Sequence, residues 1–260
     1  MSTRVRLDNL LVQRGLAVSV SQAQALVLAG VVLVDGALAR KPGARVASAA
    51  QLSVRERPPY VSRGGLKLAA ALEAFGVSPR GLVCADVGAS TGGFTDCLLQ
   101  HGAARVYAID VGYGQLAWSL RQDGRVVVME RTNARYLTTL PEPVGLVTLD
   151  ASFISLDKLL PVVVGWLTAP RIALPLIKPQ FEAGRRQVGR GGVVRDRAVH
   201  RQVLEQVAQL AVRSGMSVWG VMRSPLTGPA GNVEFMMYLR AEPAPSDFDV
   251  MAAVDRALDG

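Results

Sequence analysis

The fold of this chain is decided by the stretch Asp86–Phe94, which reads DVGASTGGF. It follows the apolar run Leu82–Ala85 and precedes an apolar segment with helical character at 94–99. A strand, a glycine-rich turn and a helix in this order form the cofactor-binding corner of a doubly wound α/β sheet. The stretch therefore predicts an α/β domain with a Rossmann-like sheet that holds a nucleotide-like molecule.

Two common phosphate-binding loops do not fit this turn. A P-loop needs lysine where Phe94 stands, and a dinucleotide fingerprint needs glycine where Ser90 stands. An acid, Asp86, stands at the entrance of the turn instead. These features favour S-adenosylmethionine (SAM), which is an adenosine with a cationic tail and no phosphate.

Composition sets broad limits on the class of protein. Half of the 260 residues are hydrophobic, which is enough for one large domain or for a medium and a small one. The formal net charge of +8 favours a polyanionic partner such as nucleic acid, although a basic soluble protein of another kind fits it too.

The cysteines and the apolar stretches indicate the compartment. Cys84 and Cys97 lack metal-ligand spacing and are typical of core residues in a reducing compartment, so we expect no metal. The N-terminus has no apolar signal-peptide core, and prolines and an arginine interrupt the most apolar stretch, 159–177. We therefore expect a cytoplasmic protein without a membrane segment.

Residues 1–57 form the first predicted domain and carry a charge of +5 from eight basic and three acidic residues. The basic residues are Arg4, Arg6, Arg14, Arg40, Lys41, Arg45, Arg55 and Arg57, and the acids are Asp8, Asp35 and Glu56. Leucines at helical spacing predict a helix at 7–16. Ser19 and Gln22 have capping-box spacing for a second helix, and residues 31–39 predict a hairpin.

These elements, from Arg6 to Gly36, resemble the S4 RNA-binding domain over nearly the whole segment, with Val20 where such domains usually carry a basic residue. The resemblance implies an RNA-binding α+β domain. Its RNA-binding candidates are Arg4, Arg6, Arg14, Arg40 and Lys41. A small helical module that docks a protein partner is the alternative.

Residues 58–62 predict a short stiff linker, and residues 63–260 a second domain. Strands and helices alternate along it, which predicts a parallel sheet with helices on both faces. We expect strands at 82–86, 105–110, 125–129, 145–150, 171–177, 217–222 and 233–239. We expect helices at 64–75, 94–101, 115–121, 156–167, 197–214 and 248–258. The last strand follows a loop with little helix, which allows it to run antiparallel.

Four ionisable residues fall where such a sheet places its site. Asp150 and Lys178 each end a predicted strand, so both belong at the carboxyl edge. Glu234 starts the last strand, and Lys67 lies on the helix that enters the domain. Two ammonium and two carboxylate groups balance in charge, which makes partial burial tolerable. We expect Lys178 to take the proton of a ribose 2′-hydroxyl as general base, with Asp150 orienting it; a structural ion-pair cluster is the alternative.

Two further polar residues follow the next strands. Asp110 ends the second predicted strand, where doubly wound sheets place the acid that binds ribose hydroxyls. Asn133, after the third strand, is a candidate for contact with adenine. A helix cap and a turn residue are the alternative roles of these two side chains.

The four ionisable residues match, in order and element, the Lys-Asp-Lys-Glu tetrad of the FtsJ-like ribose 2′-O-methyltransferases. More closely, the chain resembles the TlyA family, which couples an S4 domain to such a methyltransferase domain. The motifs that carry this resemblance are Val61–Gly64, Gly88–Phe94, Asp110–Leu116, Ser152–Leu156, Lys178–Glu182 and Gly231–Glu234. The segment Pro58–Tyr60 replaces a Trp-containing linker.

The resemblance covers almost the entire chain and implies SAM-dependent 2′-O-methylation of cytidine in large-subunit rRNA, and in some members small-subunit rRNA as well. The implied catalytic residues are Lys67, Asp150, Lys178 and Glu234. The implied SAM contacts are Arg63, Asp86, Gly88, Ala89, Ser90, Thr91, Gly92, Gly93, Phe94, Asp110, Val111 and Asn133.

Arginines and glycines alternate in residues 184–192, which predicts a flexible basic loop at the mouth of the site. Its RNA-binding candidates are Arg185, Arg186 and Arg190, and Arg195, Arg197 and Arg201 are expected to extend this surface. Other classes stay open: an RNA-binding assembly factor with an inactive cofactor fold, and a methyltransferase of tRNA or another RNA. The family is also called hemolysin, but the missing signal peptide and membrane span argue against a membrane-active protein.

Overall fold

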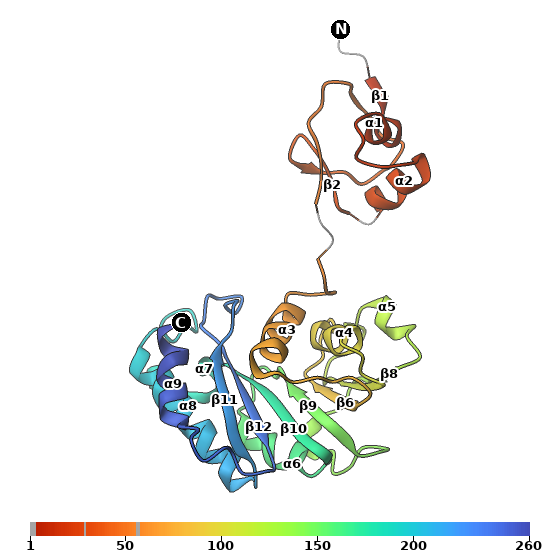
Figure 1. Ribbon diagram of the computed structural model, residues 1–260. Coiled ribbons are helices and arrows are strands. Elements are labelled where there is room, and N and C mark those ends of the chain that lie inside the picture. The colour runs from red at the N-terminus through yellow and green to blue at the C-terminus, as the bar shows by residue number, and fades with distance from the viewer. Residues whose placement is uncertain (1–3, 29, 56–57) are drawn as a thin grey trace. The chain divides into compact units, whose positions relative to one another are not determined.

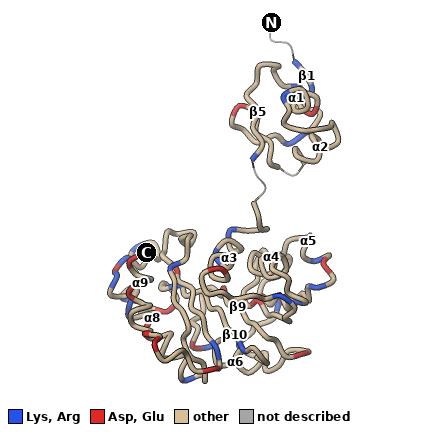
Figure 2. The backbone as a smooth tube through the Cα atoms, viewed as in Figure 1, with Lys and Arg blue, Asp and Glu red and all other residues tan. Residues whose placement is uncertain are grey.

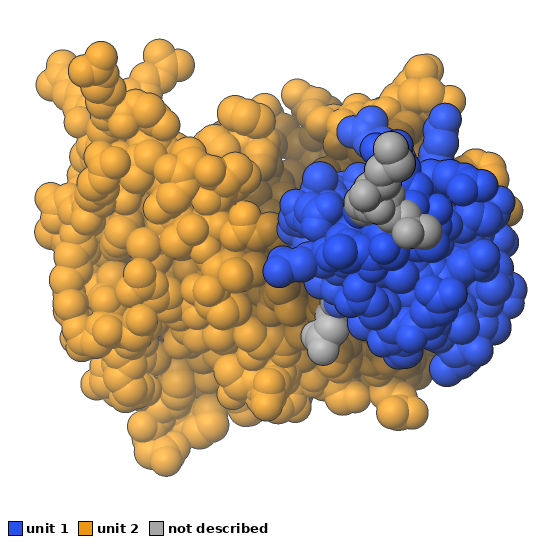
Figure 3. Space-filling view, turned by 90° about the horizontal axis from the view of Figure 1, so that it is seen from above, with its two compact units in different colours: residues 1–58 blue, residues 59–260 orange. Residues whose placement is uncertain are grey.

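The computed structural model describes residues 4–28, 30–55 and 58–260. The chain divides into two compact units, residues 1–58 and 59–260, which Figure 3 colours separately. Glu56 and Arg57, which close the first predicted domain, lie outside the described residues.

The N-terminal unit packs two helices and short strands around a small core that includes Leu7 and Leu11 (Figure 1). Its elements are β1 (Arg4–Arg6), α1 (Leu7–Gln13), α2 (Val20–Leu28), β2 (Val32–Val34), β3 (Ala37–Leu38), β4 (Arg45–Ala47) and β5 (Leu52–Val54). Half of the predicted capping box begins α2: the Ser19 hydroxyl accepts from the Gln22 N–H, but the Gln22 side chain accepts from the N–H of Val18 and not from that of Ser19. The predicted hairpin is β2–β3, and β5 joins it on the other side of β2.

The second unit is built on a seven-stranded sheet with the order β11-β12-β10-β9-β6-β7-β8. Its strands are β6 (Val83–Val87), β7 (Arg105–Ile109), β8 (Val126–Met129), β9 (Val144–Leu149), β10 (Leu167–Ile177), β11 (Ser217–Arg223) and β12 (Phe235–Arg240). Only β12 runs antiparallel to its neighbours. The predicted strands and the reversed last strand are confirmed, with ends that differ mainly at β10, which begins at Leu167.

Helices cover both faces of this sheet (Figure 1). They are α3 (Gly64–Phe75), α4 (Gly93–Gln100), α5 (Trp118–Arg121), α6 (Leu160–Val164), α7 (Pro179–Glu182), α8 (Arg197–Arg213) and α9 (Val250–Asp259). Short 3-10 turns occupy Ala134–Tyr136, Leu156–Lys158 and Arg185–Gln187. The single helix predicted at 156–167 is wrong: a 3-10 turn and the short α6 replace it, because Pro161 cannot donate within a continuous helix.

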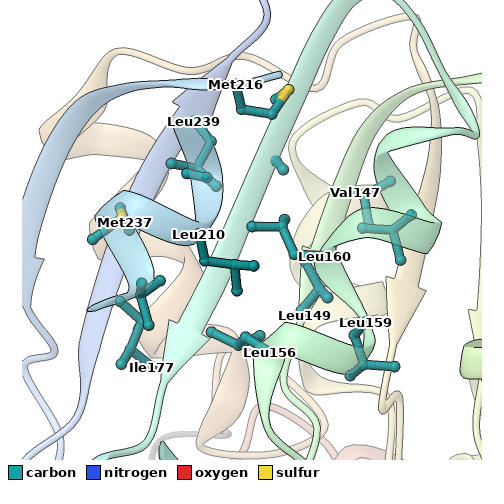
Figure 4. Packing of buried hydrophobic residues seen from close by; sticks show 14 of the residues in the cluster. Val147, Leu149, Leu156, Leu159, Leu160, Ile177, Leu210, Met216, Met237 and Leu239 are labelled. Carbon is teal, nitrogen blue, oxygen red and sulfur yellow. The ribbon is translucent and has the colours of Figure 1, made fainter. Parts of the chain in front are cut away.

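Two apolar clusters hold the layers together. One packs α6, α8 and α9 on the sheet, and Figure 4 shows Leu149, Leu160 and Leu210 meeting there. The other packs α3 and α4 on the opposite face and includes Cys84 and Cys97, which are buried as expected. Burial raises the pKa of each of these two thiols to about 12. Among the residues that the structure describes, no helix is long and apolar enough to cross a membrane.

Candidate active site

The glycine-rich turn after β6 opens onto two adjoining cavities at the carboxyl edge of the sheet. The first, of about 460 Å³, is lined on one side by Arg63 and Lys67. The second, of about 630 Å³, is lined by Asp110 and Asn133 among others. Both cavities share the residues Gly88, Ser90 and Asp150. The turn and the end of β9 therefore lie between two compartments of one site.

The turn passes very close to the end of β9. Gly88 has a φ of +84°, and a Cβ there would lie 2.7 Å from the carbonyl oxygen of Asp150. Asp110 holds the turn from the other side, since its carboxylate accepts from the backbone N–H of Ser90 at 2.8 Å and of Gly112 at 2.6 Å. Each carboxylate oxygen has a second lone pair, so Asp110 can still accept hydrogen bonds from a ligand.

The four tetrad residues form two ion pairs. Lys67 Nζ lies 2.5 Å from Glu234 Oε2, and both side chains are buried. Lys178 Nζ lies 2.6 Å from Asp150 Oδ1. That contact is poorly aligned for a hydrogen bond, because Asp150 Oδ1 accepts none in the described part of the chain. The pair is therefore held chiefly by charge.

The topology brings these pairs to one edge, as predicted. Asp150 and Lys178 directly follow β9 and β10, and Glu234 directly precedes β12. Because β12 is antiparallel to β10, Phe235 pairs with Ile177 at this edge. The helix α3 supplies Lys67, and Lys67 and Asp150 line the same cavity.

Comparison with known proteins agrees with this arrangement. Residues 60–241 match the FtsJ-like methyltransferases, and residues 5–52 match the S4 domain. This chain belongs to the FtsJ-like methyltransferase family. Its second unit has the mostly parallel sheet of the SAM-dependent methyltransferases, and its first unit contains the S4 domain.

Several relatives of this FtsJ-like chain span nearly its whole length. The 16S/23S rRNA (cytidine-2′-O)-methyltransferase TlyA of Mycobacterium tuberculosis is 52% identical over 249 residues, which are 93% of this chain and 92% of the relative. Hemolysin A of Brachyspira hyodysenteriae is 38% identical over 237 residues, 90% of this chain and 99% of that protein. A solved structure labelled a hemolysin, from Streptococcus thermophilus, is 40% identical with a TM-score of 0.73 and covers 100% of this chain and 97% of its own.

Two residues that were expected to contact SAM, Asp86 and Gly92, do not line either cavity of the FtsJ-like unit. Asp86 is inside β6, is fully buried and lines neither cavity. Its carboxylate accepts from the hydroxyls of Thr95 at 2.7 Å and Thr148 at 3.1 Å, which joins β6 to α4 and β9. Gly92 also lines neither cavity; its φ is +96°, and a Cβ would lie 2.2 Å from the side chain of Leu120. Both residues support the turn from behind.

Polar residues that the sequence did not single out hold the loops of the FtsJ-like site. The Ser152 hydroxyl accepts from Lys178 Nζ at 2.9 Å. Glu182 accepts from the Ser155 hydroxyl at 2.6 Å, which holds the segment between β9 and α6. Asn232, which is buried, accepts from the N–H of Val194 at 2.9 Å and so holds the loop before α8 against the start of β12. The side chains that make these contacts belong to the family motifs described above, but nothing in the sequence showed which partners they bind. They are Ser152, Ser155, Glu182 and Asn232.

The basic residues expected to bind RNA differ in whether an acidic side chain pairs with them. Arg185, Arg186 and Arg190 are exposed, and so are Arg4, Arg14, Arg40 and Lys41 of the S4 domain. Arg6 is also exposed but forms an ion pair with Asp8 at 2.7 Å and holds the pKa of that carboxyl at about 2. Arg197 and Arg201, which were expected to extend this surface, form ion pairs with Asp259 and Asp255 of α9, so part of their positive charge is neutralised.

We expect Gly88→Ala to weaken SAM binding about tenfold or more. Alanine is strained at this φ, and its Cβ would collide with the end of β9, so the turn must move. Titration calorimetry with SAM measures the change. Gly215→Ala is the matched control, because Gly215 has a similar φ of +77° with nothing within 4 Å of the added Cβ. Equal affinities for wild type and Gly88→Ala would contradict this role of the turn.

We expect Asp86→Asn to flatten the pH dependence of stability. Burial raises the pKa of Asp86 to about 7, so the folded state binds this proton more tightly than the unfolded state does. Its contribution to stability is therefore full below about pH 4 and is lost as the pH rises toward 7. Between about pH 5 and pH 8 the free energy of unfolding, measured in urea, should fall by on the order of 2 kcal/mol less in the variant than in wild type. The exposed Asp247→Asn is the control, and an unchanged slope for Asp86→Asn would contradict the assignment.

Proposed function

We propose that this chain transfers the methyl group of SAM to the ribose 2′-oxygen of a cytidine in ribosomal RNA, in the large subunit and also in the small. The proposal is carried by the ion pair of Lys178 and Asp150, whose side-chain atoms lie 2.6 Å apart. This ion pair lies beside the two cavities that the glycine-rich turn separates. The name of the M. tuberculosis relative, which is 52% identical, supports the choice of rRNA and of cytidine.

The residues around the two cavities fit SAM. In the second cavity, Asp110 would accept from the ribose hydroxyls. The side-chain oxygen of Asn133 already accepts from the N–H of Arg135, which leaves the side-chain NH₂ group to donate to adenine. In the first cavity, the Arg63 guanidinium would bind the carboxylate of the amino-acid end. When bound, SAM supplies the activated methyl group.

The remaining expected contacts with SAM come from the glycine-rich turn, between the adenosine end and the amino-acid end of the cofactor. The backbone there approaches the ligand closely because Gly88 has no Cβ. The residues of this group that line a cavity are Gly88, Ala89, Ser90, Thr91, Gly93, Phe94 and Val111.

Lys178 is assigned the proton transfer. After its ammonium group has released a proton to solvent, Lys178 would accept the proton of the 2′-hydroxyl while that oxygen bonds to the methyl carbon and the bond from this carbon to the sulfur of SAM breaks. Ser152 and Asp150 hold the amine in place, at 2.9 Å and 2.6 Å. Lys67 lines the first cavity, as Asp150 does, and its ion pair with Glu234 keeps the site close to neutral. Asp150 lines both cavities, and Lys178 lies beside it.

We assign residues 1–57 to RNA recognition, 58–62 to a linker and 63–260 to catalysis. The exposed basic residues of the S4 domain and of the 184–192 segment would bind phosphates. Phe153 adds a base contact: it borders the second cavity, is 91% exposed and has a φ of +63°. Such strain is typical of functional positions, and an exposed ring offers a stacking surface for an unpaired base.

The proposal is tested by tritium transfer from labelled SAM to unmodified large subunits, small subunits and naked rRNA. We expect label on a cytidine 2′-oxygen, located after nuclease digestion of the product. Label on tRNA alone would assign the same chemistry to another substrate. No label on any ribosomal RNA, despite measured SAM binding, would overturn the proposal.

A further inference from the structure

A third cavity, of about 610 Å³, lies at the carboxyl end of β11. Arg223, the last residue of β11, and Arg256, near the end of α9, both line it. Ser224 and Thr227 of the following loop line it as well. Because β11 is parallel to β10, this cavity opens at the same edge of the sheet as the tetrad.

The guanidinium groups of the two arginines have no charged or hydrogen-bonding partner among the described residues. Neither of them forms a salt bridge or a side-chain hydrogen bond with any residue that the structure describes. The acids on either side of Arg256 are already paired, Asp255 with Arg201 and Asp259 with Arg197. Figure 2 shows both signs of charge along α8 and α9. Among the described residues that line the cavity, Arg223 and Arg256 are the only ones with charged side chains.

One loop separates this cavity from the first one. Thr227 lines both of them. The loop is held at both ends against the segment that leads into β12, since Ser224 N–H donates to the Glu234 carbonyl at 2.8 Å and Gly228 N–H donates to the Asn232 carbonyl at 2.9 Å. Arg63 also donates to the Thr227 carbonyl, at 3.3 Å. The loop that follows Arg223 is thus held against the segment that contains Glu234.

We propose that Arg223 and Arg256 bind a phosphodiester group of the RNA strand on the far side of this loop from the target nucleotide's site. This inference rests on the proposed function only for the identity of the anion as RNA. A guanidinium matches two phosphate oxygens at once, and two such groups across a cavity suit one bridging phosphate. RNA carries a phosphate at every nucleotide, so a strand whose ribose enters the site presents others to its neighbourhood. The contact orients the strand and carries no sequence information.

The salt dependence of RNA binding tests the proposal. The full chain is titrated into a labelled rRNA fragment between about 50 and 200 mM salt, and log Kd is plotted against log salt. We expect Arg223→Gln/Arg256→Gln to lower the slope by about 0.7, since the two arginines share one phosphate and each lost phosphate contact on a single strand removes about 0.7. The affinity at the lowest salt should fall roughly tenfold or more.

The matched control removes the same charge at the opposite edge of the sheet. Arg80 precedes β6 and Arg213 ends α8, and both are exposed. Arg80→Gln/Arg213→Gln should leave the slope unchanged. Arg223→Lys/Arg256→Lys keeps the charges and should keep most of the slope, which separates a charge effect from a folding defect.

Equal slopes for wild type and Arg223→Gln/Arg256→Gln would overturn the phosphate site, and so would an equal loss in the control. The readout is binding, so it is independent of methyl transfer. Wild type that binds RNA with the arginine-dependent slope but transfers no methyl group would overturn the proposed function and leave this site standing.

Discussion

Lys178→Ala should lower the rate of methyl transfer by roughly a hundredfold to ten-thousandfold, the range for loss of a general base. SAM affinity should change little, because Lys178 lines neither of the two cavities. Single-turnover transfer to unmodified ribosomal subunits measures the first quantity, and calorimetry the second. A matching fall in SAM affinity would instead indicate that the Lys178–Asp150 pair holds the cofactor turn.

Lys178→Arg separates the proton transfer from the charge. Arginine keeps a cation beside Asp150 but stays protonated, so it cannot act as a base. We expect this variant to be nearly as slow as Lys178→Ala. If Lys178→Arg kept wild-type activity, Lys178 would be a positioning residue and another group would take the proton. Lys158→Ala, at an exposed ion pair with Asp157, is the control for loss of one lysine.

Lys67→Met should destabilise the fold by about 3–5 kcal/mol, the usual cost of leaving a buried partner charge unpaired. Glu234 is 2% exposed, and Lys67 Nζ is its ion-pair partner at 2.5 Å. Urea unfolding measures the change. The exposed Lys158→Met should cost less than about 1 kcal/mol, because its pair with Asp157 is half exposed to solvent.

The double variant Lys67→Met/Glu234→Leu distinguishes the two roles of this pair. Replacing both charges by apolar groups of similar size should restore most of the lost stability. Methyl transfer should stay low in the double variant if the pair serves the chemistry. Recovery of both stability and activity would make the pair purely structural.

The fold was predictable because its strands are long apolar runs that end at polar residues. Asp150 and Lys178 stand out in the sequence because each follows such a run, and parallel strands bring their ends together. Short strands such as β1 and β4 escaped prediction, since three residues give no periodic signal.

The details of the site depend on contacts that the sequence does not display. Lys67 and Glu234 lie far apart in the chain, and only the packing of α3 beside β12 pairs them. Asp86 lies within β6 because the strand continues to Val87, one residue beyond the predicted end, so its side chain is enclosed. The ion pairs of Arg197 with Asp259 and of Arg201 with Asp255 join helices that lie far apart in the chain, so the sequence did not show them, whereas Arg201 also lies 3.6 Å from Glu205 of its own helix.

The burial of both cysteines makes the native chain a convenient background for site-specific labelling. Maleimides attack thiolates, and Cys84 and Cys97 are enclosed and hold their protons at neutral pH. These are the only two cysteines in the sequence. A cysteine introduced at Val18, which is 89% exposed on the S4 domain, would therefore react alone. One fluorophore placed there would follow the arrival of the S4 domain on RNA separately from the chemistry of the methyltransferase unit.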